Sequence, residues 1–175
     1  MLDPEIETLP WDEQVSRDDV LYRRQVEYLL ARSDFYRAKL TAAGLTTADA
    51  IGGLDTIGEL PLTEKDEIRA SCSETHPMGT HVAVPREQIV RIYSTSGTTG
   101  TPSYIPLTAQ DLENWVTGSS RSYAASGVRP GETTVSTYNA GPFAAGAALA
   151  SFDRLGLCHV PVGTGNSERL IAAIR

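Results

Sequence analysis

The sequence is short of cysteine, of basic residues and of long hydrophobic runs. Cys72 and Cys158 are its only cysteines, which gives no disulfide framework and suits a reducing compartment. The net charge of −7 argues against non-specific binding to nucleic acid, which needs a basic surface. The longest apolar stretch, residues 143–152, is too short to cross a bilayer, and the acidic segment 1–11 lacks the apolar core of a signal peptide. We therefore expect a cytoplasmic protein with neither nucleic-acid nor membrane partners.

The overall composition predicts a globular fold with an α/β part. Hydrophobic residues make up 41% of the chain and charged residues 21%, which is typical of soluble globular proteins. Residues 1–85 predict a helical N-terminal segment, whereas strands and helices should alternate in residues 86–175. No internal repeat or low-complexity segment is present.

The first 85 residues carry helical periodicity and several helix-start signals. Ser16 is expected to cap the first long helix, and Ser33 should interrupt it and start a second helix that ends near Gly44. Thr63 is expected to cap a later helix that runs to about Cys72.

A metal site is not expected in this segment. Cys72, His76 and His81 have a spacing that resembles a set of metal ligands. However, residues 77–79 (Pro-Met-Gly) predict an irregular loop, and no further cysteine pair or carboxylate cluster completes four ligands.

One stretch, residues 92–102, is richer in hydroxyl groups than the rest of the chain. It reads Ile-Tyr-Ser-Thr-Ser-Gly-Thr-Thr-Gly-Thr-Pro, between apolar runs at residues 89–93 and 103–107. This pattern predicts a strand, a loop and a second strand. Gly97 and Gly100 let a ligand approach the main chain, and successive backbone N–H groups with Ser and Thr hydroxyls can bind an anion. The loop suits a polyphosphate; the alternative is a plain turn. It is not a Walker A loop, because it lacks Gly-Lys-Ser/Thr.

The remaining sequence predicts a parallel α/β layer. Thr108 should cap a helix that ends near Gly127, and strands are expected at residues 133–138 and 157–162. Helices should cover residues 143–155 and the segment that starts at Ser167. The alternation from Val90 onward predicts parallel pairing. The loops that follow Tyr93, Tyr138 and Val162 should then meet at one edge of the sheet, where such sheets bind ligands.

Several motifs together resemble a known family. Residues 94–102 resemble the phosphate-loop signature of the adenylate-forming (acyl- and aryl-CoA synthetase) superfamily. Arg91, Trp115, residues 127–131 and residues 161–169 extend this to a resemblance to the phenylacetate–CoA ligase family, of which coenzyme F390 synthetases are close relatives. The resemblance implies a partial N-terminal domain of the adenylate-forming fold, with residues 86–175 as an incomplete nucleotide-binding subdomain.

The family resemblance also implies a reaction and its cofactors. A carboxylic acid would react with ATP, assisted by Mg²⁺, to give an acyl-adenylate, which coenzyme A would convert to a thioester. The substrate would be a small aryl carboxylate. The residues implied to hold the ATP phosphates are Ser94, Thr95, Ser96, Gly97, Thr98, Thr99 and Gly100. Those implied to line the acid pocket are Tyr138, Ala140, Gly141, Phe143, Gly163 and Gly165.

Two positions depart from the family pattern. Thr101 stands where the family often has lysine, so the loop lacks a cation and should bind a triphosphate more weakly unless another cation compensates. Ala140 stands where a second tyrosine is common, which would enlarge the acid pocket or change its polarity. The alternative for Tyr138 and Phe143 is that they are ordinary core residues.

The later motifs of the superfamily do not occur in these 175 residues. The chain is therefore expected to be the N-terminal part of a ligase, inactive alone, with its catalytic residues unknown. The open alternatives are a nucleotide- or partner-binding module from a truncated or split ligase, and a coenzyme F390 synthetase-like adenylating enzyme. The expected protein partner is a second copy or a complementing C-terminal portion.

Overall fold

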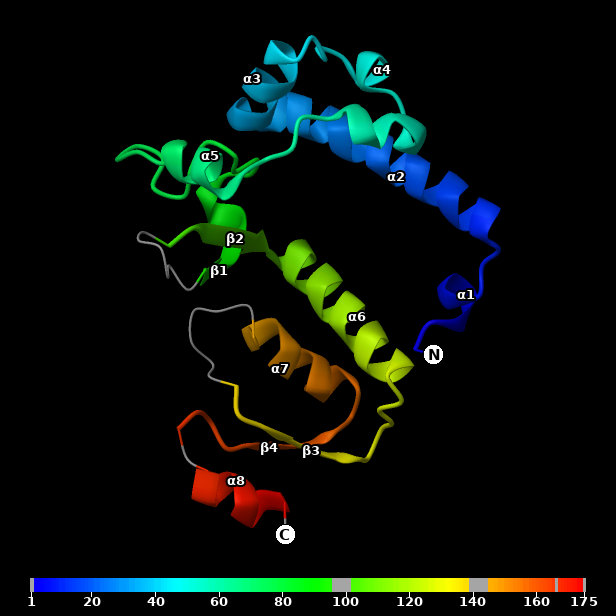
Figure 1. The fold of residues 1–175 in the computed structure, drawn as a ribbon, viewed down its shortest axis with the longest axis vertical. Helices are drawn as coiled ribbons and strands as arrows, with labels where there is room; N and C mark the ends of the chain where they lie inside the picture. Colours follow the sequence, from blue (N-terminus) through cyan, green and yellow to red (C-terminus); the bar gives the residue numbers. More distant parts are fainter. Residues whose placement is uncertain (1, 96–101, 139–144, 166, 175) are drawn as a thin grey trace. The chain divides into compact units, whose positions relative to one another are not determined.

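The computed structural model describes residues 2–95, 102–138, 145–165 and 167–174 (Figure 1). The chain divides into two compact units, residues 8–88 and residues 1–7 with 89–175, and each unit is described by itself. Whether residues 1–85 and 86–175 fold as separate domains stays a prediction.

Residues 8–88 form a helical unit around a small apolar core. Val26, Leu40 and Ile51 are buried at its centre. Its elements are α2 (Trp11–Arg32), α3 (Asp34–Ala42), α4 (Ala48–Ile51), the 3-10 helix η1 (Leu54–Glu59), α5 (Lys65–Ala70) and the 3-10 helix η2 (Arg86–Gln88).

Two of the predicted helix starts in this unit were wrong. Helix α2 begins at Trp11, directly after Pro10, and Ser16 lies inside it with its hydroxyl donating to the Asp12 carbonyl at 2.8 Å. A proline has its φ fixed near the helical value and has no N–H to satisfy, so it can precede a helix without a side-chain cap. Helix α5 is capped by Glu64 rather than Thr63; the Glu64 backbone N–H donates to the Glu67 side chain at 2.7 Å.

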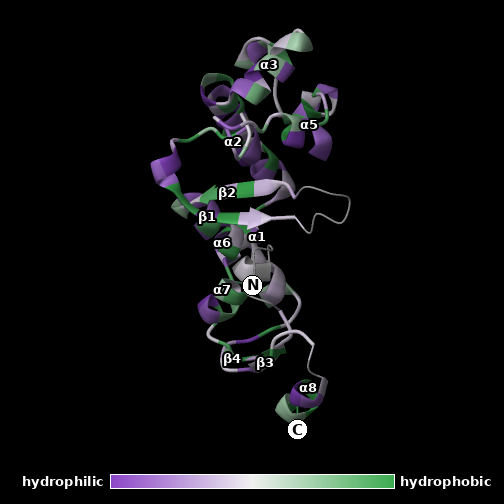
Figure 2. Cartoon of the chain, turned by 90° about the vertical axis from the view of Figure 1, so that its left-hand side faces the viewer, coloured by the Kyte–Doolittle hydropathy of each residue, from purple (hydrophilic) through white to green (hydrophobic). Residues whose placement is uncertain are grey.

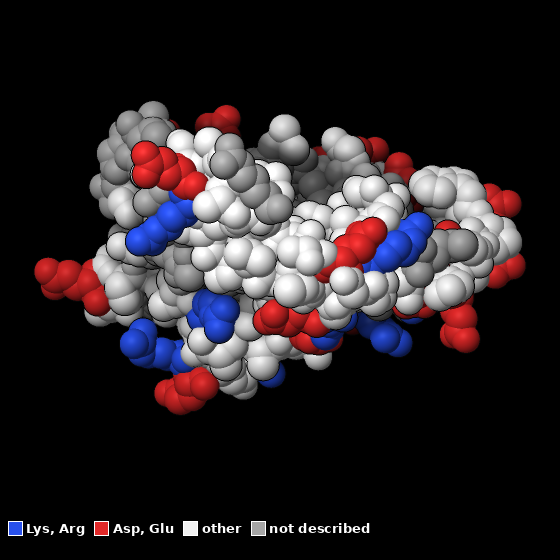
Figure 3. Space-filling view, turned by 90° about the horizontal axis from the view of Figure 1, so that it is seen from below, with Lys and Arg blue, Asp and Glu red and all other residues white. Residues whose placement is uncertain are grey.

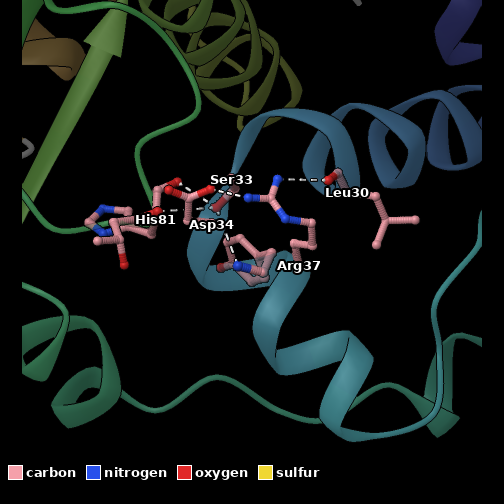
Figure 4. A network of polar contacts seen from close by, with 7 residues as sticks. Leu30, Ser33, Asp34, Arg37 and His81 are labelled. Carbon is pink, nitrogen blue, oxygen red and sulfur yellow. Dashed lines mark hydrogen bonds and ion pairs between the residues drawn. The ribbon is translucent and has the colours of Figure 1, made fainter.

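The predicted break at Ser33 is confirmed, and Figure 4 shows why it forms. The Ser33 hydroxyl accepts from the Tyr36 N–H at 3.3 Å, which caps α3, and donates to the His81 carbonyl at 3.2 Å. Asp34 and Arg37 form an ion pair beside it. Because Ser33 is fully buried, both its hydrogen bonds are made within the protein, as a buried hydroxyl requires.

Residues 1–7 and 89–175 form the second unit, which contains helices and two small sheets. Its elements are α1 (Pro4–Glu7), β1 (Ile89–Ser94), β2 (Tyr104–Thr108), α6 (Ala109–Ala125), β3 (Thr133–Ser136), α7 (Ala145–Arg154), β4 (Cys158–Pro161) and α8 (Ser167–Ile174). The α/β class with preceding helices is confirmed.

The pairing of the strands corrects part of the prediction. Strands β3 and β4 pair in parallel, as expected, but β1 and β2 pair antiparallel. The described strands make two two-stranded sheets, β1–β2 and β3–β4. The link from Ser94 to Tyr104 is too short for the crossover of a dozen or more residues that parallel strands need, so the two strands form a hairpin.

The β1–β2 hairpin packs one face against α6. Tyr93 and Leu107 are buried there, and Trp115 of α6 lies edge-on to the Tyr93 ring at a centroid distance of 5.7 Å. In Figure 2 both strands are green over most of their length and near white where β1 stops and β2 starts. The buried Tyr93, one residue before the end of β1, therefore anchors the hairpin to α6 close to its loop end.

Candidate functional site

The two ends of the predicted phosphate loop are held side by side. The Thr95 N–H donates to the Ser103 carbonyl at 3.0 Å, and the Ser103 N–H donates to the Thr95 hydroxyl oxygen at 3.1 Å. We call this pair of residues the loop neck. Ser94 ends β1 immediately before it. The two flanks of the loop are thus held together by the Thr95 hydroxyl and by three backbone groups, the Thr95 N–H and the Ser103 N–H and carbonyl.

Most of the predicted phosphate-binding residues lie outside the described part of the chain. They are Ser96, Gly97, Thr98, Thr99 and Gly100, together with Thr101. Of the predicted set, only Ser94 and Thr95 are described, and both are half-buried. Ser103 also belongs to the neck, although sequence reasoning assigned it only to the following strand. No sequence signal could have placed it there, because its position opposite Thr95 follows from the register of the hairpin.

A positively charged side chain lies close to the loop end of β1. The Arg91 guanidinium donates to the Tyr93 hydroxyl at 3.4 Å. That hydroxyl lies against Gly146 in the first turn of α7, where a Cβ would be 2.9 Å from it. Strand β1, an arginine and the start of α7 therefore come together at the Tyr93 side chain, two residues before Thr95 in the sequence.

The ends of β3 and β4 lie together, as the sequence predicted for these two strands. Ser136 pairs with Pro161, and the Val162 N–H donates to the Ser136 carbonyl at 2.9 Å. Tyr138 and Gly163 each follow two residues after the paired strand ends. Strand β1 pairs with β2 in the other described sheet, so the prediction that the loop after Tyr93 leaves the same sheet edge was wrong.

Tyr138 lies near a second tyrosine, Tyr123 of α6. It is 46% exposed, which excludes a core position for it. Burial raises the pKa of the Tyr123 phenol, and the neighbouring Tyr138 phenol raises that pKa further. The other predicted residues of this turn, Ala140, Gly141 and Phe143, lie outside the described residues.

Gly163 and Gly165 form the turn that leads to α8. Their φ angles are 78° and 81°, a left-handed conformation that glycine adopts without strain. A Cβ at either position would meet no atom within 4 Å. The turn therefore requires glycine for its backbone conformation and leaves open space around it.

A polar pair joins the two parallel strands under this edge. The Ser136 hydroxyl and His159 Nε2 are 2.7 Å apart. The His159 ring lies edge-on to Phe152 of α7 at a centroid distance of 5.1 Å, and Phe152 in turn contacts Tyr123. These contacts fix β3 and β4 to α6 and α7.

Charge and metal-ligating groups are spread across the molecule. On the face shown in Figure 3, basic and acidic side chains are interspersed. Among the residues that the structure describes, no three His, Cys, Asp or Glu side chains gather closely enough to hold a metal ion. None of the described helices has the length and apolar character required to span a membrane.

Curated relatives match the chain from end to end. Over 176 aligned residues it is 35% identical to a phenylacetate–coenzyme A ligase from Thermus thermophilus, and over 175 residues it is 33% identical to one from Escherichia coli. The resemblance to the phenylacetate–CoA ligase family is confirmed. The chain spans 38% of the length of each of these ligases. No family model matches it.

Solved structures of another CoA ligase share the fold. The structure of 2-hydroxyisobutyryl-CoA ligase in the postadenylation state with 2-HIB-AMP aligns with a TM-score of 0.84 and 25% identity, over 98% of this chain and 36% of that one. An open conformation of the same ligase, with 2-HIB-AMP and CoA, gives a TM-score of 0.82 at 24% identity. Like the phenylacetate–CoA ligases, these proteins are much longer than the chain.

Proposed function

We propose that the chain is the N-terminal portion of an ATP-dependent aryl-acid–CoA ligase of the cytoplasm, and that it contributes the polyphosphate loop and one wall of the acid pocket. The end-to-end match to phenylacetate–CoA ligases supports this proposal. The observation that carries it is the loop neck, which holds the flanks of a hydroxyl- and glycine-rich loop together at 3.0 and 3.1 Å.

The role of the loop would be to hold a triphosphate through hydrogen bonds. Residues 94–100 would donate hydroxyl and backbone N–H groups to the phosphate oxygens, and such donors are effective because they are oriented before the charge develops. ATP would supply the adenylyl group, with Mg²⁺ carried on its phosphates.

The acid pocket would lie at the ends of β3 and β4. Tyr138, Gly163 and Gly165 leave the same sheet edge, and the glycine turn has open space beside it. A small aryl carboxylate could stack on the exposed Tyr138 ring there. Ala140, Gly141 and Phe143 are proposed to complete this wall.

Calorimetric titration of the chain with ATP and with AMP tests nucleotide binding. We expect heat of binding with ATP. Thr98→Val should weaken binding about tenfold by removing one hydrogen bond to a charged oxygen. Thr46→Val, at an exposed position in residues 8–88, is the control and should bind as the unmodified chain does. Absence of heat with both nucleotides would overturn the proposal.

A nucleotide- or partner-binding module without catalysis is the second candidate, favoured by Thr101, which stands where the family often has a lysine. Exchange of labelled pyrophosphate into ATP, with a panel of aryl acids, separates the two. The ligase proposal predicts exchange once the remainder of such a ligase, in the same chain or added separately, is present. A nucleotide-binding module predicts ATP binding without exchange under either condition, and a partner-binding module predicts neither ATP binding nor exchange.

A further inference from the structure

The face of the β1–β2 hairpin that points away from α6 is apolar. Tyr93 and Leu107 lie on the face packed against α6. Because side chains alternate between faces along a strand, their neighbours Ile92 and Pro106, which pair with each other, point the opposite way. Ile92 is 42% exposed, and Tyr104 on the same face is 40% exposed. A sheet face in contact with water usually carries polar side chains, so this composition is typical of a covered surface.

No charged side chain of the two strands lies on this outer face. Its members are Ile92, Ser94, Tyr104 and Pro106. Val90, beside them, is 56% exposed. Arg91 points to the inner face, where its guanidinium donates to the Tyr93 hydroxyl. The chain has a net charge of −7, so copies of it repel each other overall. A surface through which two copies associate must be free of like charges, and the outer face meets this requirement.

The edges of the same sheet, unlike its outer face, are protected against pairing with another strand. The Thr95 N–H donates to the Ser103 carbonyl, and hydrogen-bonded and non-hydrogen-bonded pairs alternate along an antiparallel ladder. Ile92 and Pro106, three pairs further along, are therefore a non-hydrogen-bonded pair, so Pro106 presents no N–H at the outer edge of β2. A bulge-like shift in register near the start of β1 interrupts the edge of that strand. Because prolines and bulges at edges hinder strand addition, we expect association through the face.

We propose that this outer face is an interface between two copies of the chain, which pack face to face about a two-fold axis. Sheets that pack in this way lie about 10 Å apart, and the side chains of the two faces interdigitate. Ile92 and Tyr104 of each copy are then buried against the outer face of the other. Because the contact uses the same face of both copies, the assembly closes at a dimer. The dimer requires no nucleotide.

The size of the face predicts a weak dimer. The face offers only a few side chains per copy, and interfaces smaller than about 1,200 Å² in total are typical of transient complexes. We therefore expect a dissociation constant on the order of 10 μM. Added salt should not dissociate the dimer, because it screens the repulsion between the two acidic chains and leaves the apolar contacts intact.

Sedimentation velocity of the chain across a concentration series tests the interface. Ile92→Lys places like charges close to each other across the two-fold axis and should weaken dimerisation roughly tenfold or more. Leu21→Lys, at a 53% exposed position on α2, is the matched control and should sediment as the unmodified chain does. Tyr104→Ser removes apolar area without adding a charge and should weaken the dimer about tenfold. It replaces Ile92→Lys if that variant fails to fold.

A chain that stays monomeric at about 100 μM, tenfold above the expected dissociation constant, overturns the inference. The outer face is then left to the part of the longer ligase relatives that the chain does not span. A dimer that neither Ile92→Lys nor Tyr104→Ser weakens lies at another surface, and a dimer that added salt dissociates is held by charges; either result contradicts the inference. ATP binding is tested separately by calorimetric titration, so failure of the dimer leaves the proposed function standing.

Discussion

At the residue scale, Gly146 shows how the absence of a side chain decides a contact. A Cβ at this position would lie 2.9 Å from the Tyr93 hydroxyl and 3.1 Å from its Cε1. The Tyr93 ring is 3% exposed and packed against Trp115, so it has little space into which to move. Helix α7 can therefore approach β1 this closely only with glycine at this point.

Gly146→Ala should destabilise the protein by roughly 1–3 kcal/mol, the usual cost of overpacking, although alanine by itself favours a helix over glycine by about 1 kcal/mol. Gly118→Ala on α6 is the control, because its Cβ would meet no atom within 4 Å. That change should stabilise the protein by roughly 0.5–1 kcal/mol. Urea unfolding measures both. Equal stabilisation by the two substitutions would show that α7 and Tyr93 are not in contact.

At the scale of elements, β2 and α6 are joined without an intervening loop. Thr108 is the last residue of β2 and also the N-cap of α6, as the sequence predicted. Its hydroxyl oxygen accepts from the Asp111 N–H at 3.1 Å, and its own N–H donates to the Asp111 carboxylate at 2.9 Å. The direction in which α6 leaves the hairpin is set by this reciprocal cap.

Thr108→Ala should cost about 1 kcal/mol, because it leaves N-terminal N–H groups of α6 without the cap. Thr108→Ser keeps the hydroxyl and should retain most of that free energy. The free energies of unfolding in urea give the comparison. A loss for Thr108→Ser as large as that for Thr108→Ala would assign the effect to the threonine methyl group and not to the cap.

At the scale of the whole molecule, the chain is acidic, with a net charge of −7. Part of its folding stability depends on carboxylates that stay ionised and paired. The Glu64 backbone N–H, and then the Lys39 ammonium at 2.5 Å, hold the pKa of the Glu67 carboxyl below its usual range. Because this pKa is lower in the folded than in the unfolded chain, the pairing stabilises the protein above the unfolded pKa. That stabilisation is lost as pH falls through the folded pKa.

We expect the melting temperature to fall as pH drops from about 5 toward 3, and Glu67→Gln to reduce the steepness of that fall. Glu67→Gln should also melt lower at neutral pH, since Lys39 loses its partner. Glu59→Gln, an exposed position on η1, is the control and should follow the unmodified profile. Scanning calorimetry across this pH range tests the expectation, which fails if the Glu67→Gln profile runs parallel to that of the unmodified chain.

The sequence by itself determined the features that depend on residues close along the chain. The caps at Ser33 and Thr108 follow from side chains that reach backbone N–H groups three residues away. The hydroxyl-rich loop between two apolar runs is visible in the sequence because strands and turns differ in composition. The ligase resemblance rests on motifs of this local kind, and its confirmation by curated relatives needed no coordinates.

Only the tertiary structure decided which distant residues meet. The contacts of Thr95 with Ser103, of Gly146 with Tyr93 and of Ser136 with His159 depend on strand register and on how helices pack on strands. A shift of one residue in register would turn the strand side chains of Tyr93, Ser136 and His159 to the opposite face. Local sequence patterns fix the period of a strand but not its partner, so the loop neck became visible only in the folded chain.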